Sequence, residues 1–306
     1  MRPSPTLDTA IVGSGIAGLS AALTLVRVCR NVAVFGSGSH RNAVAAHSHN
    51  FITRDGTPPD QLLASARADV ERYGVEVEEE WVERIERDGE NFVLALRSGR
   101  TVTAHTVILA TGVRDVLPSI PGLAEAWGRN VVHCPYCHGY ELRGRTTVVL
   151  GHTEDDIHKA GLLAGLTRTI TLCTGGPDVL GADALALLSE RGVAVDERPV
   201  ARIRLEGEAA AAIEFEDGEE RPCGAVYITP EVRLNNDLAH SLGVAVEHKN
   251  HLVNSDKGRT GVPGVYVAGD GSGSSHQLIA AAASGFDAAC AANSDLVERG
   301  ATFGKG

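Results

Sequence analysis

The chain has 306 residues, of which 43% are hydrophobic and 22% charged, which is typical of a globular protein with room for two domains. Its net charge of −11 argues against nucleic acid or an anionic membrane as a partner, because no basic surplus faces the phosphates. No apolar run approaches the roughly 20 residues of a spanning helix. The first residues lead into a glycine motif instead of a signal-peptide cleavage site, so we expect a cytoplasmic protein.

The first predicted element is a βαβ unit near the N-terminus. Apolar residues at 10–12 predict a buried strand, those at 19–25 a helix, and those at 31–35 a second strand. The turn from Gly13 to Gly18 has the spacing G-x-G-x-x-G. Its glycines allow a tight turn, let backbone N–H groups approach a pyrophosphate, and bring the helix close to the strand. The unit therefore predicts a dinucleotide site at the start of this helix.

Two later segments complete the same predicted domain. Residues 106–112 form an apolar strand that ends in Thr-Gly, and residues 264–270 form another that ends in Gly-Asp. Together with Gly13 to Gly18 they resemble the FAD-binding pattern of flavoprotein disulfide reductases with two dinucleotide domains. The resemblance implies that Asp270 binds the ribityl chain of the flavin, although an N-cap before the C-terminal helix is an alternative role.

A second βαβ pattern lies between these segments. It consists of a strand at 147–151, a helix at 157–166 and strands at 169–172 and 225–229. The expected fold class is therefore α/β, with two Rossmann-like domains and the second inserted in the first, as in thioredoxin reductase. The predicted FAD-binding domain comprises residues 1–114 and 244–306, and the inserted NADPH-type domain comprises residues 115–243.

The inserted domain carries the most reactive sequence of the chain, Cys134-Pro135-Tyr136-Cys137. In a reducing cytoplasm such a pair is more often redox-active or metal-binding than structural. Zinc would need further ligands, which neither the histidines at 47–49 nor the other cysteines supply, so we expect no metal. The remaining cysteines are expected to be buried apolar side chains: Cys29, Cys173, Cys223 and Cys290.

The position of this pair resembles that in low-molecular-weight thioredoxin reductases, over nearly the whole chain. The stretch from Cys134 to Glu141 is still more similar to the thioredoxin-reductase-like dithiol oxidases, which close disulfides in natural products such as gliotoxin and holomycin. The resemblance implies that Cys137 faces the flavin and Cys134 exchanges with the substrate, although the two roles could be reversed. It also implies FAD as cofactor and a homodimer.

His138 follows the second cysteine, where thioredoxin reductases usually carry an acid. A histidine here can take a proton from an incoming thiol near neutral pH, so we predict a catalytic role. The alternative is a residue at the helix start that is hydrogen-bonded to the backbone. Glu141 is expected to favour the helix dipole, and orienting the imidazole is its alternative role.

The predicted FAD site departs from the family pattern in one place. Gly36 stands where an acid usually holds the adenosine ribose, so Ser37 or nearby backbone must replace it. The helix after residue 276 is expected to point its N-terminus at the flavin, or else to pack as an apolar helix. The predicted cofactor-binding residues are Gly13, Ser14, Gly15, Ala17, Gly18, Ser37, Arg41, Asn42, Asn50, Val82, Thr111, Gly112, Gly269, Asp270, Gln277 and Leu278.

The second dinucleotide fingerprint is degenerate. Gly151 is retained, but Thr153 and Asp156 stand where the second and third glycines belong, and the acids at 154–156 would repel a pyrophosphate. NADPH-dependent relatives carry a basic cluster after the next strand, where this chain has Cys173 to Gly176. We therefore expect that NADPH does not bind.

These features predict an FAD-dependent dithiol oxidase. The substrate is expected to be a small-molecule dithiol, and the electrons pass through Cys134, Cys137 and FAD to molecular oxygen, which becomes hydrogen peroxide. One alternative is a disulfide reductase of the thioredoxin-reductase type that uses NADPH or ferredoxin. Another is a flavin-binding redox sensor without turnover.

Overall fold

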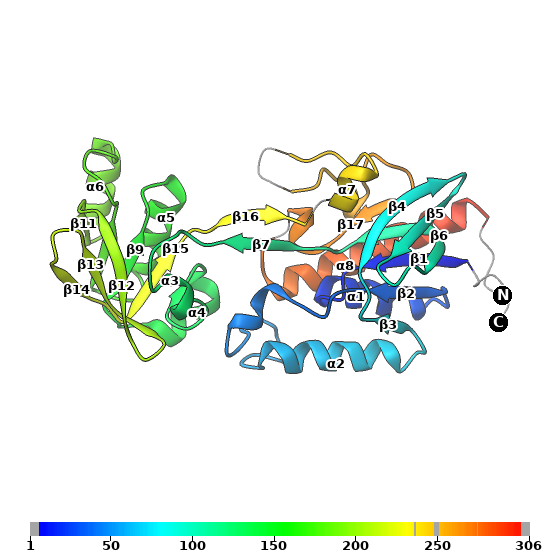
Figure 1. Ribbon diagram of the computed structural model, residues 1–306, viewed down its shortest axis with the longest axis horizontal. Helices are drawn as coiled ribbons and strands as arrows, with labels where there is room; N and C mark the ends of the chain where they lie inside the picture. Colours follow the sequence, from blue (N-terminus) through cyan, green and yellow to red (C-terminus); the bar gives the residue numbers. More distant parts are fainter. Residues whose placement is uncertain (1–5, 236, 248–250, 274, 301–306) are drawn as a thin grey trace. The chain divides into compact units, whose positions relative to one another are not determined.

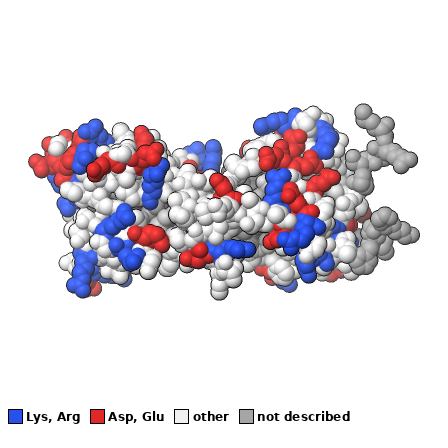
Figure 2. Space-filling view, turned by 90° about the horizontal axis from the view of Figure 1, so that it is seen from below, with Lys and Arg blue, Asp and Glu red and all other residues white. Residues whose placement is uncertain are grey.

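A computed structural model describes residues 6–235, 237–247, 251–273 and 275–300, and the chain divides into two compact units (Figure 1). The first unit comprises residues 1–43, 50–114 and 232–306, and the second comprises residues 44–49 and 115–231. Among the described residues no helix combines the length and the apolar composition that crossing a bilayer requires. On the face drawn in Figure 2, acidic and basic side chains are interspersed.

The first unit is built on a seven-stranded sheet. The strand order is β3 (Glu76–Glu78), β2 (Val32–Phe35), β1 (Leu7–Val12), β6 (Thr101–Leu109), β5 (Asn91–Leu96) and β4 (Val82–Asp88), and β17 (Val265–Val267) also pairs with β6. The pairs among β3, β2, β1, β6 and β17 are parallel, whereas β4, β5 and β6 pair antiparallel. Val12, Leu109 and Val267 share one register position, so the carboxyl ends of three strands meet at one edge.

The two faces of this sheet have separate apolar cores, because successive side chains of a strand point to opposite faces. Ile11 packs with the helices α1 (Ile16–Val26) and α8 (Leu278–Glu298), whereas Ala10 and Val12 pack with β4 and β5. The unit also contains α2 (Pro59–Glu71), α7 (Asp237–Ser241) and short 3₁₀ turns at Asp256–Gly258 and Gly269–Ser272; a further 3₁₀ turn, Arg41–Val44, begins in it.

The second unit contains a five-stranded parallel sheet with the order β11 (Val193–Asp196), β10 (Ile170–Cys173), β9 (Thr147–Leu150), β15 (Ala225–Ile228) and β8 (Val131–Val132). One core joins it to the antiparallel sheet of β12 (Val200–Glu206), β13 (Ala209–Phe215) and β14 (Glu220–Pro222), and to α3 (Leu123–Ala126). The other core includes residues of α4 (Pro135–Leu142), α5 (Glu154–Leu163) and α6 (Ala182–Glu190). The chain passes between the units at β7 (Val113–Val116) and β16 (Glu231–Leu234), which pair with each other.

This architecture confirms the predicted α/β class with Rossmann-like sheets. The compact units differ from the expected domain limits in two places. Residues 232–243 belong to the first unit instead of the insertion, because Leu234, Leu238, Ala239 and Leu242 pack into its core. Residues 44–49 belong to the second unit, which no local pattern in the sequence indicated.

Candidate active site

The glycines of the first fingerprint are required by close packing. Gly13 has φ 117°, and a Cβ there would lie 2.1 Å from the carbonyl oxygen of Ala110, at the end of β6. A Cβ at Gly18 would lie 1.9 Å from the carbonyl oxygen of Gly13. These contacts hold the start of α1 against the carboxyl edge of the sheet, where β1, β6 and β17 end.

Gly15 differs from its two neighbours in the motif. A Cβ at this position would have no described atom within 4 Å, and Gly15 is the N-cap of α1 with no side-chain cap. The start of α1 therefore has open space beside Gly15 and no side-chain cap for its first N–H groups, as a helix that binds a phosphate group requires. This cradle fits the pyrophosphate of a dinucleotide such as FAD.

The end of β17 brings further predicted residues to the same edge. Arg41 donates to the carboxylate of Asp270 over 2.9 Å, and both side chains are mostly buried. The N–H of Gly269 donates to Ser284 Oγ of α8 over 2.8 Å. A Cβ at Gly269 would lie 3.0 Å from that of Ala17, so β17, α1 and α8 converge here.

The packing around Gly36 explains why this position has a glycine where the family pattern has an acid. A Cβ at this position would lie 2.3 Å from Ser14 Oγ, so a longer side chain cannot fit beside Ser14. Ser37, the predicted substitute, is exposed, and its Oγ accepts from the N–H of Ser39 at 3.4 Å.

The other predicted cofactor residues occupy varied positions. Thr111 donates to the carbonyl of Asn235, and Gly112 follows with φ 64°. Asn50 has φ 62°, and its N–H donates to Asp55 Oδ1. Asn42 lies in the 3₁₀ turn Arg41–Val44, and Gln277 and Leu278 are the N-cap and first residue of α8. Val82, also predicted to bind the cofactor, begins β4 as a 5% exposed residue.

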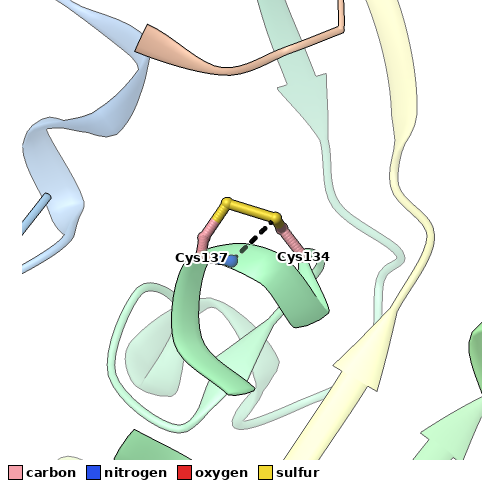
Figure 3. The surroundings of a disulfide bond; sticks show 2 residues. All are labelled: Cys134 and Cys137. Carbon is pink, nitrogen blue, oxygen red and sulfur yellow. Dashed lines mark hydrogen bonds between the residues drawn. A yellow bond between two sulfur atoms is a disulfide. The ribbon is translucent and has the colours of Figure 1, made fainter. Parts of the chain in front are cut away.

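In the second unit, Cys134 and Cys137 form a disulfide at the start of α4 (Figure 3). Cys134 is the N-cap of the helix, Pro135 its first residue, and Cys134 Sγ accepts from the N–H of Cys137 at 3.1 Å. A sulfur at a helix N-terminus is stabilised as a thiolate after reduction, because the N–H group and the helix dipole both favour negative charge. Tyr136 and Tyr140 are 68% and 70% exposed on this helix.

His138 is a half-buried residue next to the disulfide, and both of its ring nitrogens are buried. Neither ring nitrogen has a hydrogen-bond partner within the described part of the chain, so the alternative role of a backbone-bonded residue finds no contact there. Burial lowers the pKa of His138, Glu141 opposes this shift, and His49 adds to it. Glu141 itself lies 3.6 Å from His49 Nε2. The described residues contain no group of three or more His, Cys, Asp or Glu arranged to hold a metal ion.

The degenerate fingerprint of the second unit is filled by its own side chains. Thr153 caps α5 by accepting from the N–H of Asp156, and Asp156 Oδ2 accepts from the N–H and Oγ1 of Thr153 over 3.0 and 2.6 Å. Thr229 donates to Asp156 Oδ1, and the buried Lys159 donates to Thr229 Oγ1 and to the carbonyl of Ile228. A Cβ at Gly151 would lie 2.1 Å from Asp156 Oδ2.

Sequence reasoning identified Thr153 and Asp156 as misfits for a nucleotide but not as partners. The spacing Thr-x-x-Asp before an apolar helix is a capping-box pattern, and it could have predicted this pairing. The link to Thr229 had no local signal, because it joins residues 73 positions apart.

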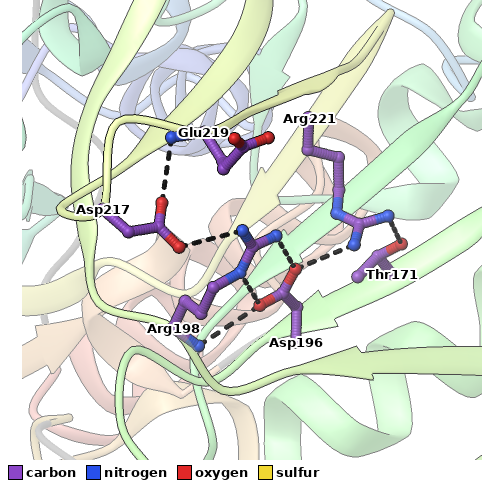
Figure 4. Close-up of polar contacts among 6 residues, drawn as sticks. All are labelled: Thr171, Asp196, Arg198, Asp217, Glu219 and Arg221. Atoms are coloured by element: carbon purple, nitrogen blue, oxygen red, sulfur yellow. Dashed lines mark hydrogen bonds and ion pairs between the residues drawn. The ribbon is translucent and has the colours of Figure 1, made fainter.

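A second polar cluster lies at the ends of β10 and β11, where Cys173 pairs with Asp196. Asp196 accepts from Arg198 at 2.8 and 2.9 Å and from Arg221 at 2.8 Å, and Arg198 also contacts Asp217 (Figure 4). The two guanidinium groups hold the pKa of Asp196 far below its usual range, against the effect of burial. Both arginines near this sheet edge are therefore engaged by carboxylates.

Comparison with known proteins assigns the chain to a family. Residues 7–285 match the family described as pyridine nucleotide-disulphide oxidoreductase. Thioredoxin reductase tcpT of Claviceps purpurea is 35% identical, with 88% of each chain covered, and thioredoxin reductase sirT of Leptosphaeria maculans is 30% identical, with 96% of this chain and 95% of that protein covered.

Two solved structures are also similar. The crystal structure of HlmI has a TM-score of 0.93 and 34% identity, and covers 98% of this chain and 95% of its own. An oxidoreductase from Agrobacterium tumefaciens has a TM-score of 0.90 and 34% identity, over 96% of this chain and 99% of its own. The chain therefore belongs to the pyridine nucleotide-disulphide oxidoreductase family, within its thioredoxin-reductase-like flavoproteins, whose cofactor is FAD.

Proposed function

We propose that this protein is an FAD-dependent dithiol oxidase that closes a disulfide in a small molecule. The overall reaction is R(SH)₂ + O₂ → R(S–S) + H₂O₂, in which two electrons and two protons leave the substrate. We expect it to act as a cytoplasmic homodimer. The observation that carries the proposal is the N-terminus of α5, whose N–H groups are engaged by Thr153 and Asp156 where an NADPH pyrophosphate would need them.

The cysteine pair performs the exchange with the substrate. A substrate thiolate attacks Cys134 Sγ, the bond to Cys137 breaks, and Cys137 leaves as a thiolate. The second substrate thiolate then attacks the substrate sulfur of this mixed disulfide and releases Cys134, which the N–H of Cys137 stabilises. His138 accepts a proton from the incoming thiol, since burial lowers its pKa and so favours the neutral imidazole. FAD held at the start of α1 would supply the acceptor for the two electrons, with oxygen as the final acceptor.

The arginine cluster also supports the loss of NADPH. A 2′-phosphate needs an uncommitted cation near the end of β10, and Arg198 and Arg221 are paired with Asp196 instead. The second candidate function is a disulfide reductase, which the names of the fungal relatives favour.

Anaerobic flavin bleaching distinguishes the two functions. The yellow protein is mixed with NADPH in one sample and with dithiothreitol in another, and oxygen uptake is then followed after air is admitted. We expect bleaching by the dithiol alone and recovery of colour with about one oxygen consumed per disulfide formed. The Cys134→Ser and Cys137→Ser variants are the controls, and neither should oxidise a dithiol. Bleaching by NADPH would establish the reductase instead.

A further inference from the structure

His49 and Glu141 form an ion pair beside the buried base of the proposed reaction. His49 Nε2 lies 3.6 Å from Glu141 Oε1, and their side chains are 20% and 44% exposed. Glu141 lies three residues after His138 on α4, so the two side chains are neighbours on one face of the helix. Because residues 44–49 belong to the same compact unit as α4, the cluster lies within one unit.

Glu141 and His49 both act on the charge of His138. Glu141 favours protonated His138 and His49 disfavours it, so both act on the same imidazole. Tyr227 of β15 also faces this cluster: its hydroxyl has no partner among the described residues, and burial, with a further contribution from Glu141, raises its pKa to about 12. On the same segment as His49, the His47 ring is 6.5 Å away. Glu141 and His49 are therefore the two charged or titratable side chains that act on the His138 imidazole.

Oxidation of a dithiol requires more than one proton transfer. The two substrate thiols lose their protons in successive steps, whereas one imidazole accepts only one proton. Both ring nitrogens of His138 are buried, and burial disfavours its charged form. His138 is therefore ready for the second thiol only after it has passed the first proton on, either to a released cysteine thiolate or to a neighbouring group.

We propose that Glu141 and His49 relay protons from His138 to solvent, which makes His49 the second proton carrier of the dithiol reaction. Glu141 is more exposed than His49 or the nitrogens of His138, so the protons that His49 carries reach water at Glu141. The inference rests on the proposed function only for the exchange at Cys134–Cys137, a step that a disulfide reductase would share.

The test is the anaerobic exchange reaction of the FAD-loaded protein with dithiothreitol. Samples are quenched with iodoacetamide, and newly alkylated Cys134 and Cys137 are counted by peptide mass spectrometry. For His49→Ala we expect a rate at pH 7 lower by about tenfold, less than the roughly 10²–10⁴-fold effect of a direct general acid or base, because His49 acts through His138. Added imidazole should restore the rate in proportion to its concentration. The deficit should shrink towards pH 9, where the dithiol itself ionises with a pKa of about 8.5.

His47→Ala is the matched control, because it removes a neighbouring exposed histidine outside the pair. Glu141→Gln should reproduce the loss, and His49→Gln replaces His49→Ala if the latter does not retain flavin. A rate equal to that of His47→Ala overturns the relay, as does a loss that is constant with pH and insensitive to imidazole. Failure of the oxidase proposal is seen separately, as the absence of oxygen uptake by the unmodified protein whose cysteines still exchange.

Discussion

The two units begin their first crossover helices in opposite ways. Both β1 and β9 lead into a glycine with positive φ, Gly13 at 117° and Gly151 at 140°. In the first unit the N-cap of α1 is Gly15, which has no side-chain cap and open space before it. In the second unit the N-cap of α5 is Thr153, which forms a reciprocal capping box with Asp156.

The difference shows that the βαβ scaffold alone does not determine whether a nucleotide binds. A helix start must satisfy its N–H groups either with a ligand or with the chain's own side chains. Gly15 provides no side-chain partner for them, whereas Thr153 and Asp156 satisfy each other's N–H groups. A few side chains therefore separate a cofactor site from a structural copy of it.

Placing threonine in the first unit should have the largest effect. In Gly15→Thr the new side chain has no protein neighbour to displace and is a good N-cap, so the fold should retain its thermal stability. It occupies the approach of the pyrophosphate, and we expect FAD affinity to fall by about a hundredfold, as for loss of a close backbone contact with phosphate. Flavin absorbance after gel filtration, together with the melting temperature of the apoprotein, measures both. Full retention of FAD would contradict the assigned role of Gly15.

The reciprocal change in the second unit should cost stability and gain no cofactor. Thr153→Gly with Asp156→Gly removes the capping box and leaves Thr229 and buried Lys159 without their carboxylate. We expect a loss of about 3 kcal/mol in the free energy of unfolding, measured by urea denaturation.

FAD content should be unchanged in this double variant, and NADPH should still fail to bleach the flavin, because Arg198 and Arg221 stay bound to Asp196. Asp155→Asn is the matched control, since this exposed acid of the same turn lies outside the capping box. Bleaching by NADPH in the double variant would mean that the side chains at 153 and 156 alone had closed the site.

The sequence was sufficient for the features that depend on local pattern. Strand and turn at 10–18, the ends of β6 and β17 and the place of the cysteine pair all follow from short motifs, and the α/β class from their order. Gly36 needed the structure, because the reason for its small size is Ser14, which lies on another turn.

Contacts between residues far apart in the chain could not be predicted from the sequence. Asp196 and Arg221 are 25 positions apart, and His49 meets Glu141 only because residues 44–49 pack with the second unit. α7 is short, and its apolar residues carry no mark of the unit whose core they join.

The start of α4 adds a third N-cap to the comparison, with a smaller expected effect on stability. Its cap is the sulfur of Cys134, which accepts from the N–H of Cys137. Cys134→Ser and Cys134→Ala both remove the disulfide, but serine retains a capping oxygen. We expect the serine variant to be more stable by about 1 kcal/mol in urea denaturation, the usual value of an N-cap. Equal stability would mean that the cap contributes nothing beyond the disulfide.

The smallest expected effect is on the pH dependence of stability, through His138 near the start of α4. α5 holds the carboxyl of Asp156 near the cation of Lys159, whereas α4 holds His138, whose pKa is lowered by burial. As pH falls below about 6.5, the unfolded chain binds a proton at His138 that the folded protein resists, so stability is lost until pH passes below the folded pKa. His138→Asn should therefore lose less in melting temperature between pH 7 and pH 5 than the unmodified protein does. His158→Asn, at an exposed position of α5, should leave that difference unchanged, and an equal response of both variants would show that His138 is not held neutral by burial.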